Sequence, residues 1–254
     1  MGRSRASGPG KVGGRSSRSP SIAAMHPDLQ AAVTELYAAF ARHPRAERIG
    51  YCGHCVADAE AVVLQRVPLR RLTAGDLARF TFKLMSTWGD EADLRHFLPR
   101  ILDLFASGEQ RDGGLLTKTL SNVRYYGAAW APDELAAVEG YLLALMRQIL
   151  TDRDSYLQVT ALLEGAAENG HTVEPYLAVW AEEPGEAATV HLAYLIDDFG
   201  WTFSRDDRYH REVRAWLRTG VLACRLEAAF LATDDPQAAN RFGHALEQLE
   251  FLTA

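Results

Sequence analysis

Cysteine and lysine are scarce in this 254-residue chain. Three cysteines are too few for a disulfide framework, and an odd number cannot pair completely within one chain. No stretch approaches the roughly 18 to 20 uninterrupted apolar residues of a membrane span, so we expect no membrane partner. Only three lysines accompany 24 arginines, which indicates the codon usage of a GC-rich bacterial genome.

Catalytic and nucleotide-binding motifs are missing as well. The sequence has no G-x-S-x-G nucleophile elbow, no G-x-x-x-x-G-K-[ST] phosphate loop and no dinucleotide-binding fingerprint. No pair of alternating apolar segments joined by a hairpin turn is visible either. We therefore predict no catalytic residue and favour a protein that is not an enzyme.

Charge is distributed unevenly along the chain. Residues 1–24 hold five basic side chains and no acid, so the formal net charge of −6 leaves −11 on the remainder. An acidic body disfavours nucleic acid as a partner, because binding to phosphates requires clustered positive charge. The first segment lacks the apolar core of a secretion signal, which favours the cytoplasm as the location.

The same segment marks the expected domain boundary. Residues 1–24 are rich in Gly, Ser and Arg and cannot bury enough apolar surface to offset chain entropy. We predict a disordered basic tail there, or a true translation start at Met25, followed by a single all-α domain over 25–254.

Helical periodicity runs through that domain. Apolar residues recur three and four positions apart, most clearly from Leu94 to Phe105 and from Leu135 to Ile149. Thr73 followed by Asp76 is typical of a helix start. Pro99 inside the clearest stripe predicts a kink, or two helices that meet near Leu98. The predicted helices cover 27–42, 55–66, 73–87, 90–106, 115–126, 132–150, 154–168, 173–182, 185–199, 206–218, 220–232 and 237–252.

Short connections between these segments predict antiparallel helical hairpins. Hairpins stacked in sequence are typical of an α-solenoid of the HEAT or TPR kind, although no self-similar repeat motif recurs. An irregular helical bundle is the alternative. Only Arg48 to Tyr51 is expected to be extended.

One segment carries distinctive chemistry, namely Cys52-Gly53-His54-Cys55. Two cysteines at this spacing supply half of a tetrahedral zinc site, and they can also form a reversible redox pair. A third interpretation is two thiols whose spacing is accidental, and all three stay open. The tetrad resembles that of protein disulfide isomerases, but no predicted sheet supports a thioredoxin fold, so that activity is not transferred.

A second constellation lies on the helix predicted over 90–106. Asp90 and Asp93 precede its apolar stripe and are typical of a helix cap, and His96 follows one turn later. Asp93 either orients His96 toward a metal or simply completes the cap while His96 packs. We hypothesise that Cys52, Cys55 and His96 converge on one point, with zinc as the possible cofactor.

These motifs together resemble an uncharacterised family of bacterial cytosolic proteins. The resemblance rests on Cys-x-x-Cys at 52–55, Thr-x-Gly-Asp at 87–90 and His-Phe-Leu-Pro-Arg at 96–100. It covers about Tyr51 to Phe105, and those relatives usually have a proline where this chain has Gly53. The family carries no known activity, so the resemblance implies no catalytic residue.

Two functions follow from these patterns. The first is a non-enzymatic helical module that presents a groove to an unidentified protein or peptide, because amphipathic helices are present and catalytic motifs are not. The second is a thiol-redox or zinc-binding protein centred on Cys52 and Cys55, with His54 and His96 as further candidate ligands.

Overall fold

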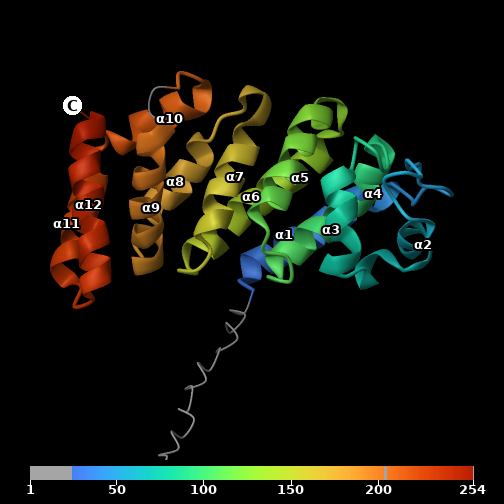
Figure 1. Cartoon of the computed structure of the whole chain (residues 1–254), viewed down its shortest axis with the longest axis horizontal. Helices are drawn as coiled ribbons and strands as arrows, with labels where there is room; N and C mark the ends of the chain where they lie inside the picture. Colours follow the sequence, from blue (N-terminus) through green and yellow to red (C-terminus); the bar gives the residue numbers. More distant parts are fainter. Residues whose placement is uncertain (1–24, 203–204, 254) are drawn as a thin grey trace, which may run out of the picture.

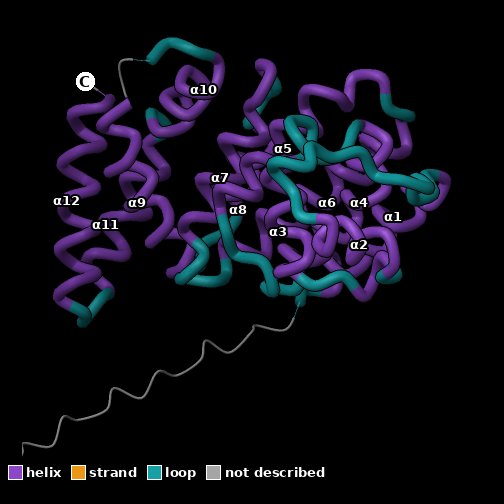
Figure 2. Tube along the Cα trace, turned by 45° about the vertical axis from the view of Figure 1, so that its right-hand side comes forward, coloured by secondary structure: helices purple, strands orange, loops and turns teal. Residues whose placement is uncertain are grey.

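The structure is a computed structural model that describes residues 25–202 and 205–253. The tail predicted over 1–24 lies outside the described residues. Twelve α-helices and four short 3-10 helices make up the described part, where the β-structure is confined to isolated bridges. Figure 2 shows this dominance of helix, and the all-α prediction is confirmed.

The first six α-helices occupy the N-terminal half of the chain. They span Pro27–Ala39 (α1), Asp58–Arg66 (α2), Ala74–Lys83 (α3), Glu91–Ala106 (α4), Gly113–Tyr126 (α5) and Pro132–Leu150 (α6). The remaining six span Tyr156–Ala167 (α7), Glu174–Glu182 (α8), Glu186–Thr202 (α9), Arg208–Leu217 (α10), Gly220–Ala232 (α11) and Pro236–Thr253 (α12). The 3-10 helix Glu168–Gly170 (η4) directly follows α7.

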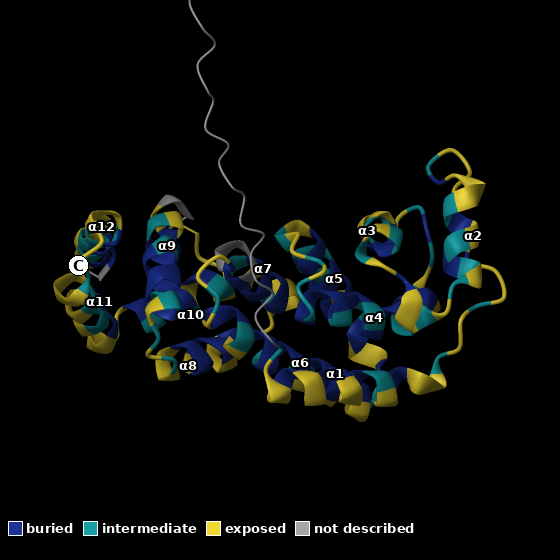
Figure 3. Cartoon of the chain, turned by 90° about the horizontal axis from the view of Figure 1, so that it is seen from below, coloured by how far each residue is buried: buried dark blue, intermediate teal, exposed yellow. Residues whose placement is uncertain are grey.

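The helices lie in two rows along the long axis of the molecule. Seen from below in Figure 3, α3, α5, α7, α9 and α12 form one row, and α1, α6, α8 and α11 form the other. Figure 1 shows that chain order follows the long axis from α2, near one end, to α11 and α12 at the other, while α1 lies beside α6 in the middle of the molecule. This arrangement is consistent with a solenoid and with an irregular bundle, the two predicted alternatives.

Local sequence signals explain where the helices begin. The Thr73 hydroxyl accepts a hydrogen bond from the backbone N–H of Asp76 at 3.2 Å, and the Asp76 carboxylate accepts one from the Thr73 N–H at 2.9 Å. This reciprocal pair satisfies two backbone donors that have no partner inside the helix. Pro132 occupies the first position of α6, where its missing N–H costs nothing.

Apolar residues from both rows form one continuous core. The largest fully buried side chains include Trp88, Trp180 and Tyr141. Tyr141 also donates a hydrogen bond to the Leu102 carbonyl at 2.7 Å, so its buried hydroxyl is satisfied. This single core extends through the predicted domain from α1 to α12.

Three predictions about local structure need correction, and the first is that the helix predicted over 73–87 ends at Lys83, before a turn. Helix α4 continues through Pro99, so two separate helices do not meet near Leu98. The helix predicted over 55–66 begins only at Asp58, because the preceding residues form a turn. Glu60 then accepts a hydrogen bond from the backbone N–H of Ala57 at 3.0 Å and fixes the start of α2.

Candidate functional site

The two neighbouring cysteines lie in a tight turn, which we call the thiol turn (residues 52–56). The Cys52 carbonyl accepts hydrogen bonds from the backbone N–H of Cys55 at 2.9 Å and of Val56 at 3.0 Å. Cys52 is exposed, whereas Cys55 is partly buried against the core, and neither forms a disulfide. The Cys52 residue is therefore accessible to solvent, whereas Cys55 is partly shielded from it.

The surroundings of Cys52 favour its thiolate form. Hydrogen bonds from the backbone N–H of His54, from the Cys55 thiol and from the backbone N–H of Cys55 lower the pKa of Cys52, and the positive charge of Lys83 adds to them. Each of these groups stabilises negative charge on sulfur more than it stabilises the neutral thiol.

A second segment holds the thiol turn in place, and we call it the supporting loop (residues 84–89). The Thr87 carbonyl accepts a hydrogen bond from the Cys52 N–H at 2.8 Å, and the Gly50 carbonyl accepts one from Gly89 at 2.7 Å. An isolated antiparallel bridge joins Tyr51 to Trp88. The extended segment predicted at Arg48 to Tyr51 therefore ends in this pairing.

Asp90 and Asp93 form a helix cap at the end of the supporting loop. The Asp90 carboxylate accepts from the backbone N–H of Ala92 at 2.9 Å and of Asp93 at 3.1 Å. The Asp93 carboxylate accepts from the Asp90 N–H at 3.1 Å. Burial raises the pKa of Asp93 to about 6. The hydrogen bond that its carboxylate accepts belongs to the helix cap.

His96 does not join the thiol turn. Its Nδ1 forms a hydrogen bond with the His43 carbonyl at 2.9 Å, and its ring packs edge-on against Phe97. Burial lowers the pKa of His96, which favours the neutral ring. The Asp93 carboxylate is hydrogen-bonded within the cap and does not orient His96. Of the two predicted alternatives, the contacts match a capping pair beside a packed histidine.

Convergence of Cys52, Cys55 and His96 on a metal is likewise not confirmed. Across 25–202 and 205–253 there is no group of three or more His, Cys, Asp or Glu side chains that could hold a metal ion. His54 is exposed on the thiol turn itself. Cys224 lies on α11, at the far end of the molecule from α2 (Figure 1).

A groove that the sequence did not predict runs across α5, η4 and α10. Two hollows of about 400 and about 260 Å³ adjoin at Glu168 and Asn169, which line both, and we call the pair the η4 groove. The larger hollow is lined by Thr117, Glu164, Ala167, Glu168, Asn169, Gly170, Arg205, Asp207, Arg208 and Tyr209. The smaller one is lined by Met85, Lys118, Ser121, Asn122, Tyr125, Tyr126, Glu168 and Asn169.

Asn122 is the most unusual residue of the groove. It is only 5% exposed, and its Nδ2 has no hydrogen-bond partner. A buried amide without a partner costs about 1–3 kcal/mol of stability, so a fold retains one at a definite disadvantage. Asn122 is one of the residues that line the smaller hollow.

Two residues further along α5, Arg124 belongs to a polar network that joins this helix to α6 and α8. Arg124 donates hydrogen bonds to the Glu139 carboxylate of α6 and, at 3.1 Å, to the Tyr176 hydroxyl of α8. Tyr176 in turn donates to Glu139 at 2.7 Å. These contacts lower the pKa of Glu139 although the side chain is partly buried, so the carboxylate stays charged beside Arg124.

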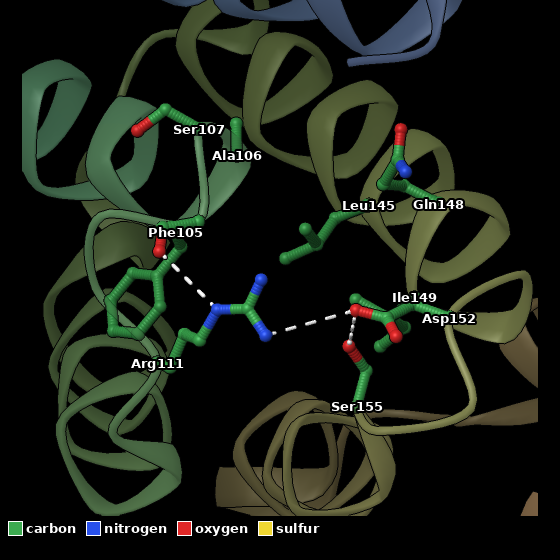
Figure 4. Close-up of a pocket in the computed structure, with 10 residues that line it drawn as sticks. Phe105, Ala106, Ser107, Arg111, Leu145, Gln148, Ile149, Asp152 and Ser155 are labelled. Carbon is green, nitrogen blue, oxygen red and sulfur yellow. Dashed lines mark hydrogen bonds and ion pairs between the residues drawn. The ribbon is translucent and has the colours of Figure 1, made fainter. Parts of the chain in front are cut away.

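A third hollow is closed to ligands by its size. Figure 4 shows Arg111, Asp152 and Ser155 meeting between the loops that follow α4 and α6. Asp152 accepts a hydrogen bond from Ser155 at 2.9 Å and lies 3.9 Å from Arg111. The cavity holds about 30 Å³, which is the room of about one water molecule. These contacts join the two loops.

Exposed apolar side chains gather on the last two helices. Val221 and Leu231 of α11 and Phe251 of α12 are 68%, 82% and 75% exposed. Phe230 contributes a further partly exposed ring near Gly243. None of the described helices is long and apolar enough to cross a membrane.

Comparisons with protein-family models, curated proteins and solved structures give no match for this chain. The described part of the chain is an all-α protein whose helices lie in two rows, with two free thiols in one turn and a separate groove of mixed polarity. The resemblance of residues 51–105 to a bacterial family stays a prediction.

Proposed function

We propose that this protein is a peptide-binding module that takes up an extended polypeptide segment in the η4 groove. The observation that carries the proposal is Asn122, a buried carboxamide with an unsatisfied Nδ2 at the groove. A carboxamide offers both a donor and an acceptor, as each peptide unit of a main chain does. Nδ2 is itself covered, so the Asn122 side chain would have to turn toward the hollow, where a bound main-chain carbonyl would accept from Nδ2 and remove the cost of its burial.

The remainder of the lining suits the side chains of such a segment. Tyr125 is 67% exposed and packs against the ring of Tyr126, and Tyr209 lines the opposite part of the groove. Tyrosine is enriched at protein interfaces because one rigid side chain offers both apolar area and a hydroxyl. The larger hollow, of about 400 Å³, is within the usual size of a ligand site.

Charge in the groove favours a polypeptide over a nucleic acid. Three basic lining residues, Lys118, Arg205 and Arg208, face three acidic ones, Glu164, Glu168 and Asp207. This balance provides no cluster of positive charge to neutralise phosphates. Recognition would then rest on the main chain and on packing, and charge would add selectivity at the ends of the segment.

The test compares wild-type protein with Asn122→Leu. A random 12-residue peptide library is selected on the wild type, and the enriched peptides are measured by fluorescence anisotropy. We expect at least tenfold weaker binding to Asn122→Leu, equivalent to about 1.4 kcal/mol. The free energy of unfolding should stay equal or rise, because an apolar side chain of similar shape replaces an unsatisfied amide.

Asn240→Ala is the matched control, because Asn240 is an exposed residue of α12 outside the groove. It should leave peptide affinity unchanged. The proposal is wrong if no peptide is enriched, or if the enriched peptides bind Asn122→Leu as tightly as the wild type.

A further inference from the structure

We propose that Cys52 and Cys55 form a dithiol–disulfide couple that exchanges with a low-molecular-weight disulfide bearing carboxylates. The geometry of the thiol turn carries this inference. A turn closed by a hydrogen bond between residues three apart brings its end Cα atoms within about 7 Å. A disulfide requires Cα atoms about 4.4–6.8 Å apart, so the turn already brings the two Cα atoms close to the range that a disulfide needs.

The two thiols differ in a way that assigns their roles. Cys52 is exposed and accepts hydrogen bonds from the backbone of His54 and Cys55, which lower its pKa. Cys55 is partly buried, and its thiol donates to Cys52. The exposed thiolate is the attacking group, and the sheltered thiol is the one that resolves the first product.

The exchange balances without any further reactant. The Cys52 thiolate attacks one sulfur of the small disulfide, a new S–S bond forms, and one small thiolate leaves and takes up a proton. The Cys55 thiol then loses its proton and attacks the Cys52 sulfur, which releases the second small thiolate. The protein loses two electrons and becomes the Cys52–Cys55 disulfide, and the small disulfide gains them as two thiols.

The neighbourhood favours an anionic disulfide over a neutral one. Arg79 donates a hydrogen bond to the Cys55 carbonyl at 2.7 Å, and the charge of Lys83 acts on Cys52, so an approaching carboxylate meets a positive field beside the attacking sulfur. Zinc is the competing occupant of two thiolates, but the described residues supply no group of three or more ligands. Stable zinc binding at a structural site normally takes four ligands.

The test uses oxidised glutathione as the probe. A Cys224→Ser variant, which removes the one other cysteine, should fall from two free thiols to none and regain both with a dithiol reductant. Its mass should show no attached glutathione, because the disulfide is internal. Adding Cys55→Ser should instead trap a glutathione adduct on Cys52. Lys83→Met should slow formation of that adduct by about two- to fivefold, the size of an exposed charge interaction.

The control is the Cys52→Ser/Cys55→Ser variant, whose exposed Cys224 reports the background rate of an ordinary surface thiol. Cys52 should react faster than Cys224 at neutral pH. The proposal is overturned if two thiols remain after oxidation, if Cys52 reacts no faster than Cys224, or if the purified protein holds stoichiometric zinc that blocks both thiols. Far-UV circular dichroism confirms that each variant is folded.

Discussion

The thiol turn and the η4 groove are both polar sites, but they are assembled in opposite ways. The thiol turn consists of adjacent residues whose geometry is set by backbone hydrogen bonds, including those to the supporting loop. The groove collects side chains from Met85 to Tyr209, held together by the packing of helices and by contacts between distant segments, such as the hydrogen bond from Arg208 to the Gly170 carbonyl at 2.9 Å. The geometry of the thiol turn therefore depends on the supporting loop, whereas the geometry of the groove depends on the spacing between helices.

The supporting loop is where the two regions touch. Thr87 binds the thiol turn, and Met85, three residues from Trp88, lines the groove. Met85 has a φ of 65°, a left-handed conformation that is costly for a side chain without a special role. Substitutions that change either the thiol turn or the η4 groove, but not both, test whether the two regions are independent.

The largest expected effect is loss of the anchor beneath the thiol turn. Trp88 is 2% exposed and packs edge-on against Phe80 with ring centroids 5.4 Å apart. Trp88→Ala should lower the free energy of unfolding by about 3–5 kcal/mol, since it opens a large cavity. Hydrogen exchange at the amides of Cys52 and Gly89 should accelerate, while exchange in α7 stays close to wild type.

Phe82→Ala is the control for this substitution, because Phe82 lies on the same stretch of chain but is 66% exposed. It should change the free energy of unfolding by less than about 0.5 kcal/mol. Equal losses in both variants would show that Trp88 does not anchor the turn.

The next effect concerns pH and the cap that ends the supporting loop. The pKa of Asp93, about 6, lies above that of an unfolded Asp, so the folded state holds this proton more tightly. The resulting stabilisation is complete below about pH 4 and is lost as the pH rises through 6. Asp93→Asn keeps a neutral side chain at every pH.

Urea unfolding of wild type and Asp93→Asn at several pH values measures this effect. The wild-type free energy of unfolding, relative to that of the variant, should fall by up to about 3 kcal/mol between pH 4 and 7. If the difference in the free energy of unfolding between wild type and variant does not change with pH, the pKa of Asp93 is not raised by folding.

The smallest of these effects separates the groove from the turn. A Cβ atom on Gly165 of α7 would lie 2.7 Å from the Leu120 Cβ of α5. Gly165→Ala should push the two helices apart, lower the free energy of unfolding by about 1–3 kcal/mol and weaken peptide binding. The reactivity of Cys52 should not change.

Gly140→Ala is the matched control, since Gly140 is exposed on α6 and its Cβ would meet nothing within 4 Å. It should raise the free energy of unfolding by about 0.5–1 kcal/mol through helix propensity. Similar behaviour of the two alanine variants would contradict close packing of α5 against α7.

The same contrast explains what the sequence could reveal. Helical periodicity and caps such as Thr73 and Asp90 are local signals, so the all-α fold and all twelve helices were predictable. The Cys-x-x-Cys spacing was equally local. No comparable sequence signal indicated Asn122. Its amide is buried and unpartnered only because of how the helices pack, which the sequence pattern does not reveal. The partner of His96 could not be predicted either, because His43 lies on a segment far away in the sequence.

Hydrogen–deuterium exchange with and without an enriched peptide tests the central claim, that the η4 groove is the binding surface, most directly. The account predicts protection over residues 117–126 and 167–171, with no change in the thiol turn. Protection over the exposed apolar residues of α11 and α12, such as Leu231 and Phe251, together with an unchanged groove, would contradict it.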